Sequence, residues 1–225
     1  MAIKPILFNT EMVRAIMDGR KTCTRRIVKD DIRDDAMWGY TAFTPKGYIS
    51  CRGAYADGYG EGFYKLPYQP GDLLYVRETW QYLYELDGNE QVIEDTGKYY
   101  YAATDTIPFD TYVDENGAKH DHVPWRPSIH MPKEAARIWL KVTDVKIERL
   151  QDVTEDGAKA EGAIDNRGFI HSPDNEYDRI HTAREHFIRI WNSTIKKSNL
   201  NRYGWNANPW VWVIEFERCE KPKEV

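Results

Sequence analysis

The stretch "DGRKTCTRR", residues 18–26, gathers four cationic side chains around two threonines and a cysteine. Arg20, Lys21, Arg25 and Arg26 stand close together in a chain whose formal net charge is −5. A basic run of this kind is often only a solvated face. Because the whole chain is acidic, any binding of nucleic acid has to come from a local patch, and this stretch is the best candidate for one.

The residues before this stretch predict a short helix over 10–19. Thr10 is an acceptable N-cap, and Gly19 is a natural stop. The basic residues therefore leave a helix at its C-terminus, where cations complement the helix dipole. That structural role would explain Arg20 and Lys21 without any ligand.

Length and composition describe an ordinary globular protein. A chain of 225 residues supports one well-buried core, so we expect a single domain over residues 1–225. Its hydrophobic content is 41% and its charged content 30%. The start lacks a cationic segment followed by a long apolar stretch, and no run approaches the roughly 18 apolar residues that span a bilayer. We therefore expect a cytoplasmic protein without a membrane partner.

The cysteines and histidines give little sign of a metal. Cys23, Cys51 and Cys219 are isolated and form no CxxC pair, which argues against a zinc ribbon and against a disulfide framework. His120 and His122 alternate, but two ligands without a third nearby are a weak signal. We predict no cofactor and no metal site, and leave a metal at the two histidines open.

Two segments interrupt the periodic pattern and predict insertions into the core. Residues 31–66 scatter glycines among tyrosines and acids, with neither the period of about 2 nor that of about 3.6. Residues 81–124 form the second insertion, in which 98–103 can be a strand and 114–117 a hairpin turn.

The segment "QPGDLLYVRETW" predicts a turn followed by a strand over 73–80. Alternation along that strand puts Glu78 among apolar neighbours, where a carboxylate needs a partner. An arginine or lysine of the basic stretch could supply the partner. A strand-end glutamate in solvent is the equal alternative.

A later strand begins near Arg137, and its apolar positions change parity at Asp144. The change predicts a bulge or a tight hairpin, as where strands bend around a small barrel. "DVTEDGAKAEGA", residues 152–163, then predicts a helix capped by Thr154. Glu161 falls in the last turn of that helix, where an acid opposes the helix dipole, and this cost marks it as a candidate functional residue.

The end of the chain predicts a helix and a strand. Thr182 and Glu185 have the spacing of a capping box, and helical periodicity continues to about Ile195. "WVWVIEFER", residues 210–218, alternates as a strand with one buried face. Since the chain shows no repeats and no regular βαβ pattern, we expect a mixed α+β fold around a small barrel.

Four blocks in this order resemble the ASCH domain family, whose fold is similar to the PUA domain of RNA-modifying enzymes. They are "GRKTCTRR", "PGDLLYVRE", "VTDVKIERLQDVTEDGAKAEG" and "WVWVIEFER". The resemblance implies a small mixed PUA-like β-barrel with flanking helices and a cleft for RNA, a nucleotide or a modified nucleoside. The longer form, with "WRPSIHMP" before the fourth block, is similar to members found in bacteriophages and prophages.

Some small bacterial members of the family are amidohydrolases that remove acetyl from 4-acetylcytidine, and the resemblance implies Lys21, Thr24 and Glu161 as their catalytic set here. Thr24 would attack, Lys21 would accept its proton if neighbouring arginines favoured the neutral amine, and Glu161 would pass a proton to the leaving nitrogen. Cys23, between the threonines, departs from the family pattern, and both insertions exceed the minimal enzymes.

The same residues suit a binding module without chemistry, because arginines hold phosphates and aromatic rings stack on unpaired bases. Our first prediction is binding of RNA or a modified nucleoside, our alternative is the amidohydrolase, and our second alternative is a ribonuclease or a phage interaction protein. A ribonuclease would use His130, although a histidine between apolar neighbours is more often structural. The predicted binding residues are Arg20, Arg25, Arg26, Arg77, Glu78 and His130.

Overall fold

A computed structural model describes residues 1–29, 32–33, 35–89, 91–108, 111–113, 118–167 and 181–223. The chain divides into two compact units, and segments distant in the sequence build each of them. Unit 1 comprises residues 1–2, 20–72 and 141–217. Unit 2 comprises residues 3–19, 73–140 and 218–225.

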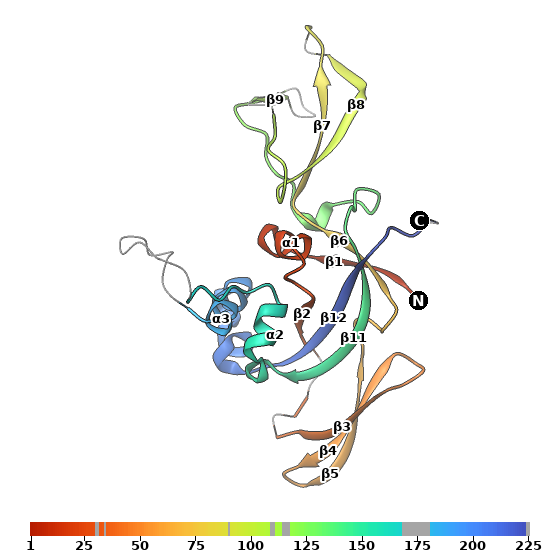
Figure 1. The fold of residues 1–225 in the computed structure, drawn as a ribbon, viewed down its shortest axis with the longest axis vertical. Helices are drawn as coiled ribbons and strands as arrows, with labels where there is room; N and C mark the ends of the chain where they lie inside the picture. The colour runs from red at the N-terminus through yellow and green to blue at the C-terminus, as the bar shows by residue number, and fades with distance from the viewer. Residues whose placement is uncertain are drawn as a thin grey trace. The chain divides into compact units, whose positions relative to one another are not determined.

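The longest sheet has five strands in the hydrogen-bonded order β1-β6-β11-β12-β2 (Figure 1). The pair β1–β6 is parallel, and the pair β12–β2 is antiparallel. Strands and helices together confirm the expected α+β class. A barrel closes only when its first and last strands pair. The order across the described residues ends at β1 and β2, so these residues form no closed barrel where the sequence predicts a small one. The strands are β1 (Ile3–Leu7), β6 (Leu73–Arg77), β11 (Trp139–Arg149), β12 (Trp210–Cys219) and β2 (Cys23–Ile27).

Unit 2 begins with β1 and helix α1 (Thr10–Met17), where the sequence predicts a helix. The N-cap is Asn9 rather than Thr10, because the Asn9 side chain accepts a hydrogen bond from the Met12 backbone N–H at 2.9 Å. Gly19 ends the turn after the helix with a φ of 74°, a left-handed conformation that glycine adopts without strain.

The second predicted insertion contains an aromatic hairpin of unit 2, β7 (Trp80–Leu86) paired antiparallel with β8 (Val92–Tyr101). The Tyr82 and Tyr99 rings lie 4.5 Å apart. Two short strands that follow in the sequence, β9 (Tyr112–Val113) and β10 (Lys119–His120), form an antiparallel pair. The turn predicted at 114–117 lies outside the described residues. A 3₁₀ turn, η1 (Ser128–His130), follows.

The first predicted insertion forms a three-stranded antiparallel sheet of unit 1, where the sequence shows no regular period (Figure 1). Its strands are β3 (Met37–Phe43), β4 (Tyr48–Tyr55) and β5 (Gly58–Lys65). Both faces of this sheet carry aromatic rings, so hydrophobicity does not alternate along its strands. The sequence pattern therefore does not reveal these strands. Trp38 of β3 stacks on Trp210 of β12 with 4.4 Å between the rings.

Strand β11 continues through Asp144, so the tight hairpin predicted there is wrong. Its buried positions do change parity, from Leu140 and Val142 to Val145. The alternation along β12 predicts one buried face, but the strand is buried on both faces over 211–214. Apolar side chains cause this, because Val211 and Val213 lie on one face and Ile214 lies on the other.

Two helices of unit 1 begin where the sequence predicts them. Helix α2 (Glu155–Ala160) is capped by Thr154, whose side chain accepts from the Gly157 N–H, and Gly162 follows it with a φ of 91°. Helix α3 (Ala183–Thr194) starts at a capping box formed by Thr182 and Glu185. The short turns η2 (Leu150–Asp152), η4 (Lys197–Asn199), α4 (Leu200–Tyr203) and η5 (Trp205–Ala207) complete the unit.

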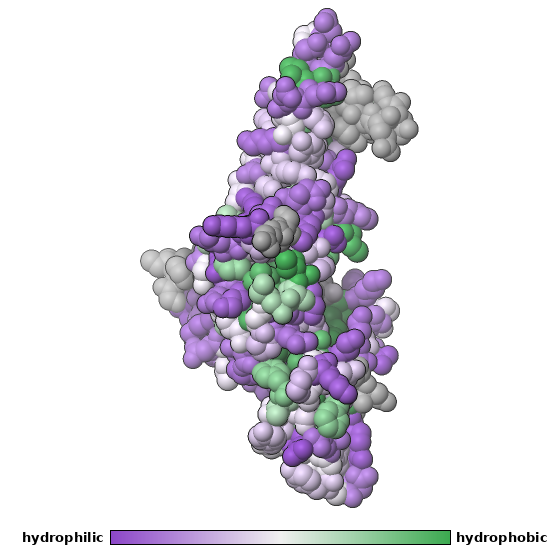
Figure 2. Space-filling view, turned by 90° about the vertical axis from the view of Figure 1, so that its right-hand side faces the viewer, coloured by the Kyte–Doolittle hydropathy of each residue, from purple (hydrophilic) through white to green (hydrophobic). Residues whose placement is uncertain are grey.

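Apolar packing joins α2 to α3 in unit 1. A buried cluster includes Val153, Ala158, Phe187 and Trp191. The face shown in Figure 2 is mostly hydrophilic, with hydrophobic residues in small patches, as a mean hydropathy of −0.70 leads one to expect. Among the helices of the described chain, none has the length and hydropathy that crossing a membrane requires.

Candidate functional site

The structure brings Lys21 and Glu161 into direct contact inside unit 1. The Lys21 ammonium donates hydrogen bonds to Glu161 Oε2 at 2.6 Å, to the Glu161 carbonyl at 2.9 Å and to the Cys23 carbonyl at 2.8 Å. The Lys21 side chain is 0% exposed and that of Glu161 is 5% exposed. Backbone hydrogen bonding supports the contact, because Lys21 and Glu161 form an isolated antiparallel bridge.

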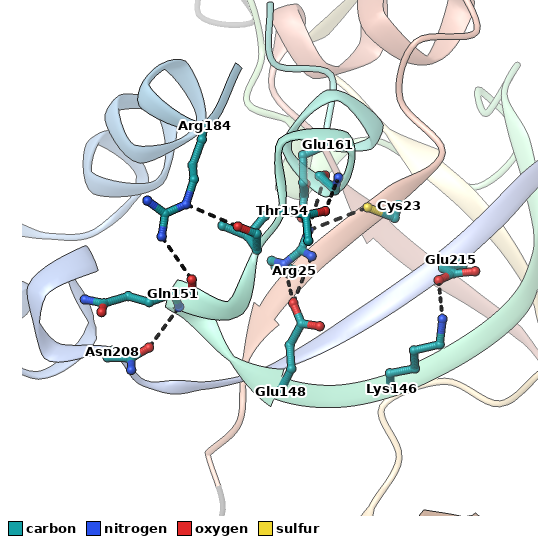
Figure 3. Close-up of polar contacts among 12 residues, drawn as sticks. Cys23, Arg25, Lys146, Glu148, Gln151, Thr154, Glu161, Arg184, Asn208 and Glu215 are labelled. Atoms are coloured by element: carbon teal, nitrogen blue, oxygen red, sulfur yellow. Dashed lines mark hydrogen bonds and ion pairs between the residues drawn. The ribbon is translucent and has the colours of Figure 1, made fainter. Parts of the chain in front are cut away.

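Arg25 joins this pair to a second carboxylate (Figure 3). Its Nε and Nη2 both donate to Glu148 Oε1, at 3.0 Å and 2.8 Å, and its Nη1 lies 3.4 Å from Glu161 Oε1. Glu161 therefore contacts Lys21 through one carboxylate oxygen and Arg25 through the other. We call Lys21, Cys23, Arg25, Glu148 and Glu161 the Glu161 cluster.

Strand alternation decides which side chains of β2 enter the cluster. Successive side chains of a strand point to opposite faces. Cys23 and Arg25 share one face, with 3.8 Å between Cys23 Sγ and Arg25 Nη1, so Thr24 and Arg26 lie on the other. Gly157 of α2 lets the guanidinium approach, because a Cβ at that position would lie 3.2 Å from Arg25 Nη2.

The loop before α2 holds the helix in place (Figure 3). Arg184 of α3 donates to the Gln151 carbonyl at 3.0 Å and to the Val153 carbonyl at 3.2 Å. The Gln151 N–H donates to the Asn208 side chain at 2.9 Å. These bonds fix the start of α2. Glu161, the C-cap at the other end of the helix, contacts Lys21 of the basic stretch.

Burial and charge change the acidity of the groups at the cluster. Burial, with the Glu161 carboxylate, raises the pKa of Cys23 to about 12. Burial opposes the charge on Arg25, but Glu161 and Glu148 outweigh it and raise the Arg25 pKa. Burial lowers the pKa of Arg26, against the opposing influence of Glu161 and of the Tyr68 hydroxyl. Arg26 and Tyr68 therefore lie within electrostatic reach of each other.

The other predicted residues of the basic stretch are arranged differently. Thr24 is buried on the face of β2 opposite Arg25. Arg20 is exposed and donates to the Gly162 carbonyl at 3.0 Å, beside the turn that ends α2. Arg26 is half-buried.

Arg77, Glu78 and His130 belong to unit 2, whereas the residues of the Glu161 cluster belong to unit 1. Glu78 is 1% exposed, so the solvent alternative is wrong, and its partner is Arg137 rather than a residue of the basic stretch. The two side chains form a bidentate pair with both distances at 2.9 Å. Arg77 donates to the Ile129 carbonyl at 3.1 Å, and His130 is exposed.

Sequence analysis missed Glu148 and Arg137, each of which is partly exposed and pairs with a buried side chain, Arg25 and Glu78 respectively. The apolar parity of Val145 and Ile147 places Glu148 on the polar face of its strand, a pattern that indicates solvent. No local signal distinguishes it from a surface acid. Within the described residues, no three His, Cys, Asp or Glu side chains gather as a metal site, and the side chain of His120 lies outside those residues.

Compared with protein-family models, curated proteins and solved structures, the chain gave no match to any of them.

Breaking the buried pair should destabilise the protein strongly, because a buried charge is then left without its partner. Glu161→Leu leaves Lys21 and Arg25 without their shared carboxylate, and we expect the free energy of unfolding to fall by about 3–5 kcal/mol. Adding Lys21→Met should restore part of the loss, because the second change removes an uncompensated charge. Urea denaturation followed by circular dichroism measures both variants.

Lys146→Met is the matched control, since Lys146 forms an exposed ion pair with Glu215 at 2.7 Å in the same unit (Figure 3). It should cost at most about 1 kcal/mol. An equal loss in Glu161→Leu and Lys146→Met would contradict the assigned importance of burial.

The raised thiol pKa values predict selective labelling. Burial raises the pKa of Cys23 and of Cys51 to about 12, so at about pH 8 both thiols stay protonated and unreactive. Iodoacetamide should therefore label the native protein at Cys219, which is only partly buried. Mass spectrometry of digested protein reads the sites, and the urea-unfolded protein, which should be labelled at all three cysteines, is the control. Rapid native labelling at Cys23 would contradict the prediction.

Proposed function

We propose that this chain is an ASCH-type, PUA-related protein that binds RNA or a modified nucleoside beside the basic stretch and the end of α2. The observation that supports the proposal is the contact between Lys21 and Glu161, which are 140 positions apart in the sequence. The family resemblance implies both residues as catalytic residues of its amidohydrolase members, and they meet in a buried cluster.

The surroundings of the pair favour binding over hydrolysis. A general base needs a nitrogen lone pair, and Lys21 Nζ already donates to three oxygens. The nucleophile that the resemblance implies, Thr24, lies on the face of β2 away from Arg25. Both features weigh against a lysine-activated threonine.

Arg26 is the residue best suited to contact a ligand. The Glu161 cluster fixes Arg25 on one face of β2, and the chain then directs the next side chain, Arg26, to the other face. The Tyr68 hydroxyl is one of the groups that influence the pKa of Arg26. A guanidinium can hold a phosphate, and a tyrosine ring nearby can stack on a base.

Arg26→Ala should weaken the binding of a single-stranded RNA oligonucleotide and flatten its dependence on salt. Losing one phosphate contact on a single strand reduces the slope of log affinity against log salt concentration by about 0.7. Fluorescence anisotropy with a labelled oligonucleotide over a series of salt concentrations measures the slope.

Arg33→Ala is the control, because Arg33 lies in the same unit but forms an exposed ion pair with Asp35 at 2.6 Å. Its salt slope should equal that of the wild type. An unchanged slope in Arg26→Ala would remove Arg26 from the interface.

The amidohydrolase remains the second candidate, because the 2.6 Å contact joins two of the three implied catalytic residues. If the protein hydrolyses 4-acetylcytidine, pure protein will release acetate, and Thr24→Val, which removes the hydroxyl at nearly constant volume, will abolish the release. Enzymatic detection of acetate between about pH 6 and pH 9 measures it, with Arg33→Ala as an active control. Our proposal of binding without hydrolysis predicts no acetate above the buffer blank.

A further inference from the structure

The β3–β4–β5 sheet of unit 1 has two unlike faces. One face packs inside the unit: Ile49 and Cys51 are buried there, and Trp38 stacks on Trp210. The other face exposes large side chains to solvent. Their exposed fractions are 71% for Met37, 58% for Tyr40, 36% for Tyr48, 77% for Tyr59 and 58% for Phe63.

Strand register shows that these side chains share a face. Tyr40 of β3 pairs with Arg52 of β4, which pairs with Glu61 of β5. Directly paired residues of antiparallel strands lie on the same side of a sheet, as do residues two apart on one strand. Tyr59 and Phe63, two residues to either side of Glu61, therefore join Tyr40 on that side.

The middle strand places a cation among the rings. Arg52 Nε donates to Glu61 Oε1 at 2.8 Å, and this bond fixes the guanidinium. Its two terminal nitrogens have no hydrogen-bond partner among the residues that the structure describes. The hydroxyls of Tyr40 and Tyr59 are close enough to affect its charge, and with the Glu61 hydrogen bond as the main cause they raise the Arg52 pKa.

We propose that this tyrosine face, made of Tyr40, Tyr48, Arg52, Tyr59 and Phe63, binds single-stranded nucleic acid. Bases stack on the exposed rings, and a backbone phosphate accepts hydrogen bonds from the terminal nitrogens of Arg52. The face shares no residue with the basic stretch, so the inference goes beyond the proposed function and stands without it.

Charge favours a nucleic acid as the ligand of this face. The positions that share the face in the register contain no isoleucine, leucine or valine, but tyrosine, phenylalanine and arginine also occur at protein interfaces, so charge is the distinguishing feature. The charged residues on the face are the cations Arg52 and Lys65 and the single carboxylate Glu61, an excess of one positive charge that matches an anionic ligand. Tyr59 and Phe63 stand about 13 Å apart along β5, so each ring can take its own base.

The double variant Tyr40→Ala/Tyr59→Ala tests the face. We expect the full-length variant to bind a fluorescein-labelled oligouridylate of twelve nucleotides at least about tenfold more weakly than the wild type, because each lost stack costs about that factor. Tyr40→Phe/Tyr59→Phe keeps both rings and should bind nearly as the wild type does. Fluorescence anisotropy measures the affinities, and an RNA duplex of the same length, whose bases are already stacked, should bind more weakly.

Phe43→Ala is the matched control. Phe43 is 48% exposed on the same strand as Tyr40, but it pairs with Ile49 and so lies on the opposite side of the sheet. Its affinity should equal that of the wild type. All of the substituted side chains are exposed, so the variants should fold, and circular dichroism checks this.

Three results would overturn the inference: an unchanged affinity in Tyr40→Ala/Tyr59→Ala, equal binding of duplex and single strand, or a wild-type dimer that this variant dissociates. The last result, read by light scattering, would assign the face to a second copy of the chain. Arg26→Ala separates the two proposals. If Arg26→Ala loses affinity and Tyr40→Ala/Tyr59→Ala does not, only the tyrosine face is overturned. If the tyrosine variant loses affinity and Arg26→Ala does not, only the proposed site at Arg26 is overturned.

Discussion

The buried ion pair between Lys21 and Glu161 is the contact on which unit 1 depends. It joins Lys21, two residues before β2, to Glu161, the C-cap of α2, and a backbone bridge runs through the same two positions. Burying two charges is costly unless their remaining hydrogen-bonding groups are satisfied. The Lys21 ammonium meets this condition with three oxygens, and Glu161 meets it by taking Arg25 on its second oxygen. Arg25 extends the cluster to Glu148 of β11, so two strands and one helix are fixed together.

The same cluster explains why adjacent residues of β2 have such different surroundings. Arg25 is held between two carboxylates, whereas Arg26 points to the opposite face of the strand and is half-buried. The different surroundings of two adjacent arginines are therefore a consequence of strand alternation. It also weakens the hydrolase hypothesis, since the lysine and the threonine that it requires are positioned for packing.

Unit 2 also contains a buried carboxylate that is neutralised by a cation. Glu78 is buried at the end of β6, and Arg137 neutralises it with a bidentate pair while lying 3.9 Å from the centre of the Tyr101 ring. In both units a buried carboxylate is paired with an arginine. Cation–π contact adds to the pairing, since Arg25 lies 5.7 Å from the centre of the Phe187 ring. The β3–β4–β5 sheet stands in contrast, since its Arg52 is exposed among exposed rings, an arrangement that contributes little to stability and suits a ligand.

By itself the sequence determined the local features: the α+β class, the caps at Thr154 and Thr182, and the glycine after α2. It also marked Glu161 as a candidate functional residue. These features depend on residues within one helical turn, so local patterns reveal them. Only the tertiary structure decided that the main sheet stays open, that Arg137 rather than the basic stretch neutralises Glu78, and that the segment 37–65 is a sheet with an exposed aromatic face. Each of these depends on which distant strands and charges come together, and the period of a single strand carries no information about its partner.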